Sequence, residues 1–114
     1  MDDFWDDLMP SAPYLKPPGA SEMLRVIVYD IACPKRLRRI AQVCEQSGVR
    51  IQKSVFECWL DEERFESLWA QLLTLLEPQE DTLAAYVLDA KAARLRRAAG
   101  QRMELTERRH WIVL

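Results

Sequence analysis

The sequence predicts an α+β fold in which strands and helices alternate along a single domain. Apolar and β-branched residues fill 24–31, which is typical of a central strand. Apolar residues recur at helical spacing after Pro34 and again after Asp61. Further strand-like segments occupy 49–60 and 82–88, and a length of 114 residues leaves room for one domain only.

The first half of the domain is expected to form a strand, a helix and a pair of short strands. Pro34 suits the first turn of the helix, where its missing N–H is not needed. The apolar face of this helix comprises Leu37, Ile40, Ala41 and Cys44. Gly48 is a natural stop just past the helix. The segment 49–60 is too long for one strand, so we expect two strands joined near Gln52–Lys53.

The second half is expected to begin with a helix. Asp61 is a suitable N-cap, and the positive end of the helix dipole favours Glu62 and Glu63 in the first turn. The apolar face of this helix comprises Phe65, Leu68, Trp69, Leu72 and Leu76. Pro78 lies beyond its end.

The remaining elements complete the topology. We expect a strand at 82–88, a helical turn rich in alanine and arginine over 89–99, and a last strand over 109–114. The order β-α-β-β-α-β, with this extra C-terminal strand, is that of the split βαβ or ferredoxin-like arrangement. Two helices on one face of the sheet leave the other face open, and dimerisation through that face suits a domain of about 92 residues. The extra strand is also suited to cross to a neighbour's sheet edge.

Residues 1–22 differ in composition from the rest of the chain. They contain four of the six prolines and carry a net charge of −4, whereas the remainder carries +2. Such a segment cannot bury much apolar surface, so we expect an acidic, disordered extension over 1–22 and a ferredoxin-like domain over 23–114. Two explanations remain open. The segment is either an upstream extension, which a misplaced translation start would also explain, or an acidic and aromatic peptide, DDFWDDLM, that folds on a partner's groove.

The composition argues against several classes of protein. No apolar run approaches the roughly 20 residues that span a bilayer, and the N-terminus lacks the features of a secretory signal. The three glycines are not grouped, which argues against a Gly-rich phosphate loop. Cys33, Cys44 and Cys58 form no CxxC pair, so we expect reduced thiols in a cytoplasmic protein.

Histidine and tryptophan offer little chemistry in this chain. His110 is the only histidine and has no histidine or cysteine pair beside it, so a structural role is favoured over a zinc site or acid–base catalysis. Trp59, Trp69 and Trp111 are expected to make core or dimer contacts rather than a stacking surface for bases.

Asp30 is the candidate catalytic and metal-binding residue. It ends an apolar strand, where an unpaired buried carboxylate is costly, and cations follow it directly. Two roles remain open: an ion pair with Lys35 or Arg36 or a cap for the turn at Pro34, or a metal ligand. In a two-fold dimer, two copies of Asp30 would face each other and share one hydrated Mg²⁺ ion, whose water would be activated for phosphodiester hydrolysis.

Two clusters of basic residues are candidate nucleic-acid-binding surfaces. The first comprises Lys35, Arg36, Arg38, Arg39, Arg50 and Lys53. No acidic residue lies within 31–44, so pairing along the helix is not its purpose; an unbalanced patch suits a polyanion's backbone, and a solvated helix face is the common alternative. No RNP-like aromatic platform is evident, so base-specific reading is not expected. A second cluster, which either extends this patch or only solvates a helix, comprises Lys91, Arg94, Arg96, Arg97 and Arg102.

The motifs described above resemble the CRISPR-associated protein 2 family. The resemblance rests on a first strand that ends in Tyr-Asp-Ile at 29–31, an arginine-rich first helix that ends at Gly48, and the segment VRIQKSVFE at 49–57. It covers residues 23–114, is specific over about the first 40 of them and is vaguer after Pro78.

The resemblance implies a ferredoxin-like homodimer that acts in the adaptation stage of CRISPR immunity. Such a dimer bridges dimers of the CRISPR integrase, CRISPR-associated protein 1, and holds the duplex DNA that is inserted as a spacer. Some members are described as Mg²⁺-dependent endonucleases on RNA or DNA, and the aspartate that matches Asp30 is their metal ligand at the dimer interface. Two functions therefore compete: a non-catalytic scaffold that binds duplex DNA, which we favour, and a metal-dependent endonuclease built on the Asp30 pair.

Overall fold

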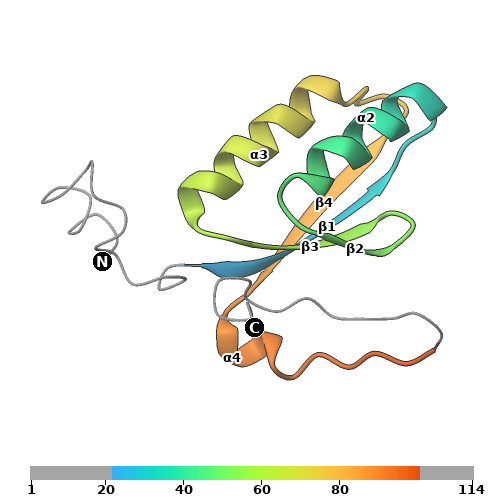
Figure 1. Ribbon diagram of the computed structural model, residues 1–114. Coiled ribbons are helices and arrows are strands. Elements are labelled where there is room, and N and C mark those ends of the chain that lie inside the picture. The colour runs from blue at the N-terminus through green and yellow to red at the C-terminus, as the bar shows by residue number, and fades with distance from the viewer. Residues whose placement is uncertain (1–21, 101–114) are drawn as a thin grey trace, which may run out of the picture.

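The computed structural model describes residues 22–100, which form a four-stranded antiparallel sheet with two long helices on one face (Figure 1). The elements follow one another as β1 (Met23–Asp30), α2 (Pro34–Glu45), β2 (Val49–Gln52), β3 (Val55–Leu60), α3 (Glu62–Leu75), β4 (Thr82–Leu88) and α4 (Ala90–Ala93). The α+β class and the predicted order of strands and helices are confirmed over these residues. The extension up to residue 21 and the predicted strand at 109–114 lie outside the described residues.

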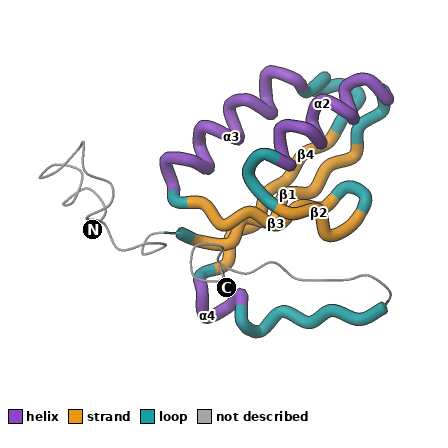
Figure 2. Tube along the Cα trace, in the orientation of Figure 1, coloured by secondary structure: helices purple, strands orange, loops and turns teal. Residues whose placement is uncertain are grey.

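β1 lies in the interior of the sheet, because the strands are arranged in the order β2-β3-β1-β4 (Figure 2). It pairs antiparallel with β3 as far as Val28↔Val55 and with β4 as far as Asp30↔Thr82. The apolar, β-branched composition of β1 suits this position between two neighbours. The register brings Asp30, at the end of β1, beside Thr82, the first residue of β4.

The core lies between the sheet and the two long helices. In β1, Ile27 and Tyr29 are buried and point toward the helices, whereas Val26 and Val28 are half-buried and point to the opposite face, as strand alternation requires. Phe56 of β3 is fully buried. The core cluster comprises Ile27, Tyr29, Ile31, Ile40, Cys44, Phe56, Cys58, Leu60, Leu68 and Leu72.

Both long helices begin where the sequence predicts. Pro34 occupies the first turn of α2, and the N–H of Gly48 donates to the carbonyl of Cys44 at 3.0 Å just past the helix end. The Asp61 side chain caps α3 by accepting from the N–H of Arg64 at 2.8 Å. None of the helices within residues 22–100 has the length and apolar character needed to cross a membrane.

Among residues 22–100, only one end of the opposite face of the sheet is covered. There, α4 and the chain after it lie below the strands (Figure 1), and Leu24 is fully buried. Arg96 Nη1 donates to Glu57 Oε1 at 2.6 Å across this face. Toward the end that carries Asp30, the face is less covered, and Tyr86 is 62 % exposed. We call the part formed by Val26, Val28, Ala84 and Tyr86 the open sheet face.

All three cysteines are free. Burial raises the pKa of the Cys44 thiol to about 11 and that of the Cys58 thiol to about 12. Both thiols therefore stay protonated near neutral pH and pack as small apolar groups, as the sequence predicted.

Gly48 tests the packing between the end of α2 and β3. A Cβ atom at this position would meet the Cys58 Sγ and the Glu57 carbonyl oxygen. We expect Gly48→Ala to lower the free energy of unfolding by about 1–3 kcal/mol, since overpacking forces backbone shifts. Urea unfolding measures the change, and Ala70→Ser on the exposed side of α3 is the control. A Gly48→Ala variant as stable as wild type would contradict this packing.

Candidate functional site

Asp30 is exposed at the end of β1. Its side chain shares the face of Val26 and Val28, so it lies at the end of the open sheet face. Within residues 22–100 the structure forms no hydrogen bond or ion pair to the Asp30 carboxylate, and the alternative of an ion pair with Lys35 or Arg36 is not realised. The carboxylate is therefore available to a ligand, and its exposure removes the desolvation penalty that the apolar sequence around it suggested.

The part of the chain that the structure describes supplies a single carboxylate at this point. Within the described range, no three His, Cys, Asp or Glu side chains are grouped so as to hold a metal ion. Mg²⁺ takes one or two carboxylates and keeps several waters, so the oxygens of Asp30 suit a hydrated ion when a second carboxylate faces them. A metal site at Asp30 stays a prediction, and it needs a second chain.

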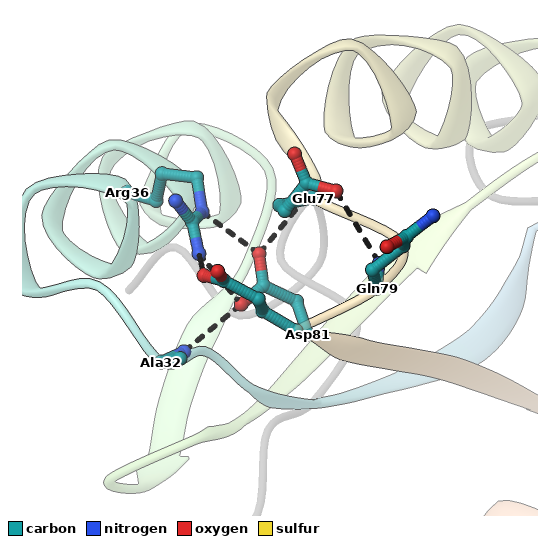
Figure 3. Close-up of polar contacts among 6 residues, drawn as sticks. Ala32, Arg36, Glu77, Gln79 and Asp81 are labelled. Atoms are coloured by element: carbon teal, nitrogen blue, oxygen red, sulfur yellow. Dashed lines mark hydrogen bonds and ion pairs between the residues drawn. The ribbon is translucent and has the colours of Figure 1, made fainter.

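A buried carboxylate, that of Asp81, joins the chain just after β1 to the turn before β4 (Figure 3). Asp81 Oδ1 accepts from the N–H of Ala32 at 2.9 Å and from Arg36 Nη2 at 3.0 Å. Asp81 Oδ2 accepts from Arg36 Nε at 2.8 Å and from the N–H of Glu77 at 2.9 Å. Arg36 Nη2 also donates to Glu80 Oε1 at 2.9 Å. These five residues are called the Asp81 cluster below.

The Asp81 cluster keeps both of its central charges. The Asp81 side chain is 0 % exposed and that of Arg36 is 24 % exposed. The Arg36 guanidinium holds the pKa of the Asp81 carboxyl well below its usual range, and the N–H groups of Ala32 and Glu77 lower it further. Hydrogen bonds to Asp81 and to Glu80 raise the pKa of Arg36 above its usual value. The pair therefore remains ionised throughout the physiological pH range.

Three of the predicted nucleic-acid-binding residues share one exposed strip of α2. Lys35, Arg38 and Arg39 are exposed, and their i, i+3, i+4 spacing places them on the same side of the helix. None of them forms an ion pair with another residue in the range 22–100. We call these three residues the α2 ridge. Because α2 packs on the sheet face opposite to the open sheet face (Figure 1), the ridge and the Asp30 side chain lie on opposite faces of the sheet, although Lys35 follows Asp30 closely in sequence.

The other predicted nucleic-acid-binding residues have different surroundings. Arg36 belongs to the Asp81 cluster. Arg50 Nη2 pairs with Glu45 Oε2 at 3.1 Å, and Arg50 Nη1 donates to the carbonyl of Lys53 at 3.0 Å. The Arg50 guanidinium also lies 5.2 Å from the centroid of the Phe56 ring. Lys53 is exposed in the turn between β2 and β3. Acidic residues that are distant in sequence, or that lie at the very end of α2, thus neutralise part of the patch.

The second basic cluster lies near α4, away from the α2 ridge (Figure 1). Lys91, Arg94 and Arg97 are exposed, whereas Arg96 is bound to Glu57. This cluster therefore does not extend the α2 ridge. Arg102, His110 and Trp111 lie outside the described residues.

Two predicted aromatic contacts can be placed. Trp69 stacks on Phe65 along α3, with ring centroids 5.9 Å apart and planes at 29°. Trp59 is half-buried in β3, beside Leu24 in the register of the sheet. The interpretation of these tryptophans as packing residues agrees with both positions.

Asp81 was missed by sequence reasoning, although one signal was present. Charged residues inside apolar strands, such as Arg25 and Glu57, point to buried ion pairs. Both form ion pairs in the structure: Glu57 pairs with Arg96 in a largely buried contact, and Arg25 Nη2 lies 3.4 Å from Oε1 of the exposed Glu62. An acidic residue directly before β4 is a weaker signal of the same kind. Its arginine partner lies 45 residues away, so only the fold reveals the pair.

The fold and the site define a class of protein: a small α+β domain with an antiparallel sheet, a strand-end carboxylate beside a partly open sheet face, and a separate cationic helix surface. The family model described as "CRISPR associated protein Cas2" matches residues 23–96. The chain therefore belongs to the Cas2 family, and the resemblance seen in the motifs at 29–31 and 49–57 is confirmed.

Relatives and solved structures agree with this assignment. The chain is 36% identical over 92 residues to the CRISPR-associated endoribonuclease Cas2 3 of Chloroflexus aurantiacus, a match over 81% of this chain and 99% of that protein. It is 45% identical over 71 residues to the CRISPR-associated endoribonuclease Cas2 1 of Moorella thermoacetica, over 58% of this chain and 74% of that protein. The crystal structure of Streptococcus pyogenes Cas2 matches with a TM-score of 0.63 and 30% identity, over 68% of this chain and 100% of that chain.

The lowered pKa of Asp81 predicts a contribution to stability that is lost in acid. Because the folded pKa lies below the unfolded value of about 4, folding stability from this group is present above pH 4 and falls as the pH drops below it. The difference in unfolding free energy between wild type and Asp81→Asn should therefore shrink as the pH falls from 6 to 2. Urea unfolding at several pH values measures it.

Glu80→Gln is the matched control for this measurement, because Glu80 contacts the same arginine but its side chain is 59 % exposed. Its difference from wild type should stay small across the same pH range. If the difference in unfolding free energy between wild type and Asp81→Asn does not change with pH, the acid-labile stability does not come from Asp81.

Proposed function

We propose that this chain acts in CRISPR adaptation as a homodimeric scaffold that binds duplex DNA and bridges the CRISPR integrase, CRISPR-associated protein 1. The observation that carries the proposal is the α2 ridge, whose three cations are exposed and have no ion-pair partner among residues 22–100. Family membership supports the setting in CRISPR immunity. The proposal treats Asp30 as a separate feature.

The proposed dimer forms through the open sheet face. The strand order β2-β3-β1-β4 and the two helices on one face support a ferredoxin-like arrangement. In such a fold the second face needs cover, and here α4 covers only the end near Leu24. Exposed Tyr86 and half-buried Val26 and Val28 supply apolar surface that a second copy would bury.

Duplex DNA suits the α2 ridge because the contact is with phosphates. Lys35, Arg38 and Arg39 present three cations along one helix side, and a two-fold dimer presents two such ridges. Exposed cations bind the sugar-phosphate backbone by releasing counterions, which needs no base contact. Because α2 lies on the face opposite to the proposed dimer contact, dimerisation leaves both ridges accessible.

The second candidate function is a Mg²⁺-dependent endonuclease. The exposed Asp30 carboxylate, which has no ion-pair partner among residues 22–100, favours it. Relatives of this chain are named endoribonucleases, which brings RNA as well as DNA into consideration as a substrate. In the proposed dimer, the two Asp30 carboxylates, one from each chain, would share one hydrated Mg²⁺ ion at the edge of the interface. The ion would supply an activated water for phosphodiester hydrolysis.

We favour the scaffold as the cellular role because the nuclease site is sparse. Residues 22–100 of each chain offer one carboxylate at this point, and they contain no grouped histidine, cysteine or acidic side chains that complete a metal site. The α2 ridge, by contrast, is complete within one chain. It also lies on the opposite face of the sheet from the Asp30 side chain, so binding and cleavage can be tested by separate mutations.

Removing the arginines of the α2 ridge tests the scaffold. We expect Arg38→Ala/Arg39→Ala to weaken binding to all duplex sequences alike and to reduce the slope of log K against log salt by about 1 for each phosphate that the variant no longer neutralises. Fluorescence anisotropy between 50 and 300 mM salt measures both quantities. Arg64→Ala, which removes an exposed charge from α3, is the control. Unchanged affinity and slope would show that the ridge is only a solvated helix face.

Replacing Asp30 tests the alternative function separately. We expect Asp30→Ala to abolish Mg²⁺-dependent cleavage of RNA or DNA while leaving duplex affinity and spacer acquisition in cells intact. Glu66→Ala, an exposed carboxylate change on α3, should leave all three unchanged. Loss of acquisition with a folded, dimeric Asp30→Ala protein would overturn the scaffold as the cellular role.

A further inference from the structure

We propose that Asp81 is a positioning residue for Asp30, and that Arg36 serves this purpose rather than contacting nucleic acid. This inference rests on the role of Asp30 given above as a metal ligand. Neither residue touches the Asp30 carboxylate. They act through two backbone segments: the chain that follows Asp30 and the strand that lies beside it.

The first contact holds the chain that follows Asp30. Ala32, two residues after Asp30, donates its N–H to Asp81 Oδ1 at 2.9 Å. Ile31, between them, is buried in the core cluster. The end of β1 is therefore fixed by one apolar anchor and one hydrogen bond to a carboxylate that is 0 % exposed.

The second contact holds the strand beside Asp30. Asp81 directly precedes Thr82, and Thr82 is the register partner of Asp30. The Glu77 N–H, which donates to Asp81 Oδ2 at 2.9 Å, closes the turn that leads into β4 (Figure 3). One carboxylate thus sets the position of the residue opposite Asp30 as well as that of the segment after it.

Arg36 fixes the orientation of the Asp81 carboxylate. It donates through Nε and Nη2 to the two oxygens at 2.8 and 3.0 Å, a bidentate geometry that lysine cannot reproduce. The Asp81 oxygens therefore accept four N–H groups, two from the guanidinium and two from the backbone. An arginine bound in this way has little freedom to meet a phosphate, in contrast to Arg38 and Arg39.

This arrangement matters for a shared metal site because each chain contributes one ligand. A hydrated ion between two carboxylates requires both to be held at a defined separation, and residues that orient ligands affect metal affinity by about 10–100-fold. Asp30 lies at a strand end, where fraying is easiest. The Asp81 cluster prevents fraying at that end.

The test uses the full-length protein and begins with the wild type. Hydrogen exchange measured by NMR should show the Ala32 amide protected at least 100-fold relative to the exposed amide of Lys53. The same sample, with ¹³C-labelled aspartate, is titrated with Mg²⁺ while the Asp30 carboxyl signal is followed. An unprotected Ala32 amide in folded wild type would overturn the inference before any variant is made.

Asp81→Asn is the decisive variant, because the amide keeps the shape but loses one acceptor atom. We expect at least tenfold faster exchange at Ala32 and about tenfold weaker Mg²⁺ binding at Asp30. Gly48→Ala, a destabilised variant remote from Asp30, is the control for stability. It should keep the wild-type exchange rate at Ala32 and the wild-type Mg²⁺ affinity at Asp30. If Asp81→Asn does not fold, Arg36→Lys provides the same readouts, since it keeps the charge but cannot form the bidentate pair.

The outcomes separate this inference from the proposed function. If the Asp30 carboxyl signal of the wild-type protein does not respond to Mg²⁺, Asp30 is not a metal ligand. The inference that Asp81 positions a metal ligand is then overturned as well, even if the Ala32 amide is protected. A wild-type Mg²⁺ response that Asp81→Asn and Arg36→Lys both retain overturns the positioning role and leaves the metal site standing. Equal losses in Gly48→Ala would also overturn it, because they would reflect stability alone.

Discussion

The arrangement of this domain around Asp30 depends on one buried carboxylate. Asp81 is excluded from solvent and accepts hydrogen bonds from the backbone of two segments and from the fork of Arg36. It joins the first turn of α2, the end of β1 and the start of β4, which are distant in sequence. A buried charge is tolerated only when it is paired and its oxygens are satisfied, and this one meets both conditions. The cluster also makes Arg36 unavailable to a ligand, because Asp81 and Glu80 bind its guanidinium.

The two candidate functional features lie on opposite sides of the sheet. Strand alternation directs Asp30 to the face opposite to the long helices, whereas helical spacing directs Lys35, Arg38 and Arg39 away from the core. Asp30 therefore forms no ion pair with the cations of α2 among residues 22–100, although it lies close to them in sequence. This separation is compatible with a protein that binds a polyanion along its helices and forms a dimer across its sheet, and the same dimer would bring two copies of Asp30 together.

Much of the fold could be predicted because its signals are local. The β-branched run before Asp30, Pro34 at the first turn of α2 and Asp61 at the cap of α3 act within a few residues, and each has the predicted role. The site was only partly predictable, because its decisive contacts join distant segments. The absence of acids within 31–44 suggested an unbalanced cationic patch that included Arg36 and Arg50. In the folded chain, Asp81 and Glu80 bind Arg36, and Glu45, beyond the segment considered, binds Arg50. Local charge counting cannot detect such partners. Of the predicted residues, Lys35, Arg38 and Arg39 have no ion-pair partner within 22–100, and their role in binding nucleic acid stays a prediction.

Arginine footprinting can distinguish whether the exposed ridge or the Asp81 cluster binds duplex DNA. The folded protein is treated with phenylglyoxal with and without duplex DNA, and modification at each arginine is quantified by mass spectrometry. The account predicts that DNA protects Arg38 and Arg39, and that Arg36 reacts slowly in both states because Asp81 and Glu80 hold its guanidinium. Protection of Arg36 by DNA, with Arg38 and Arg39 equally reactive in both states, would contradict it.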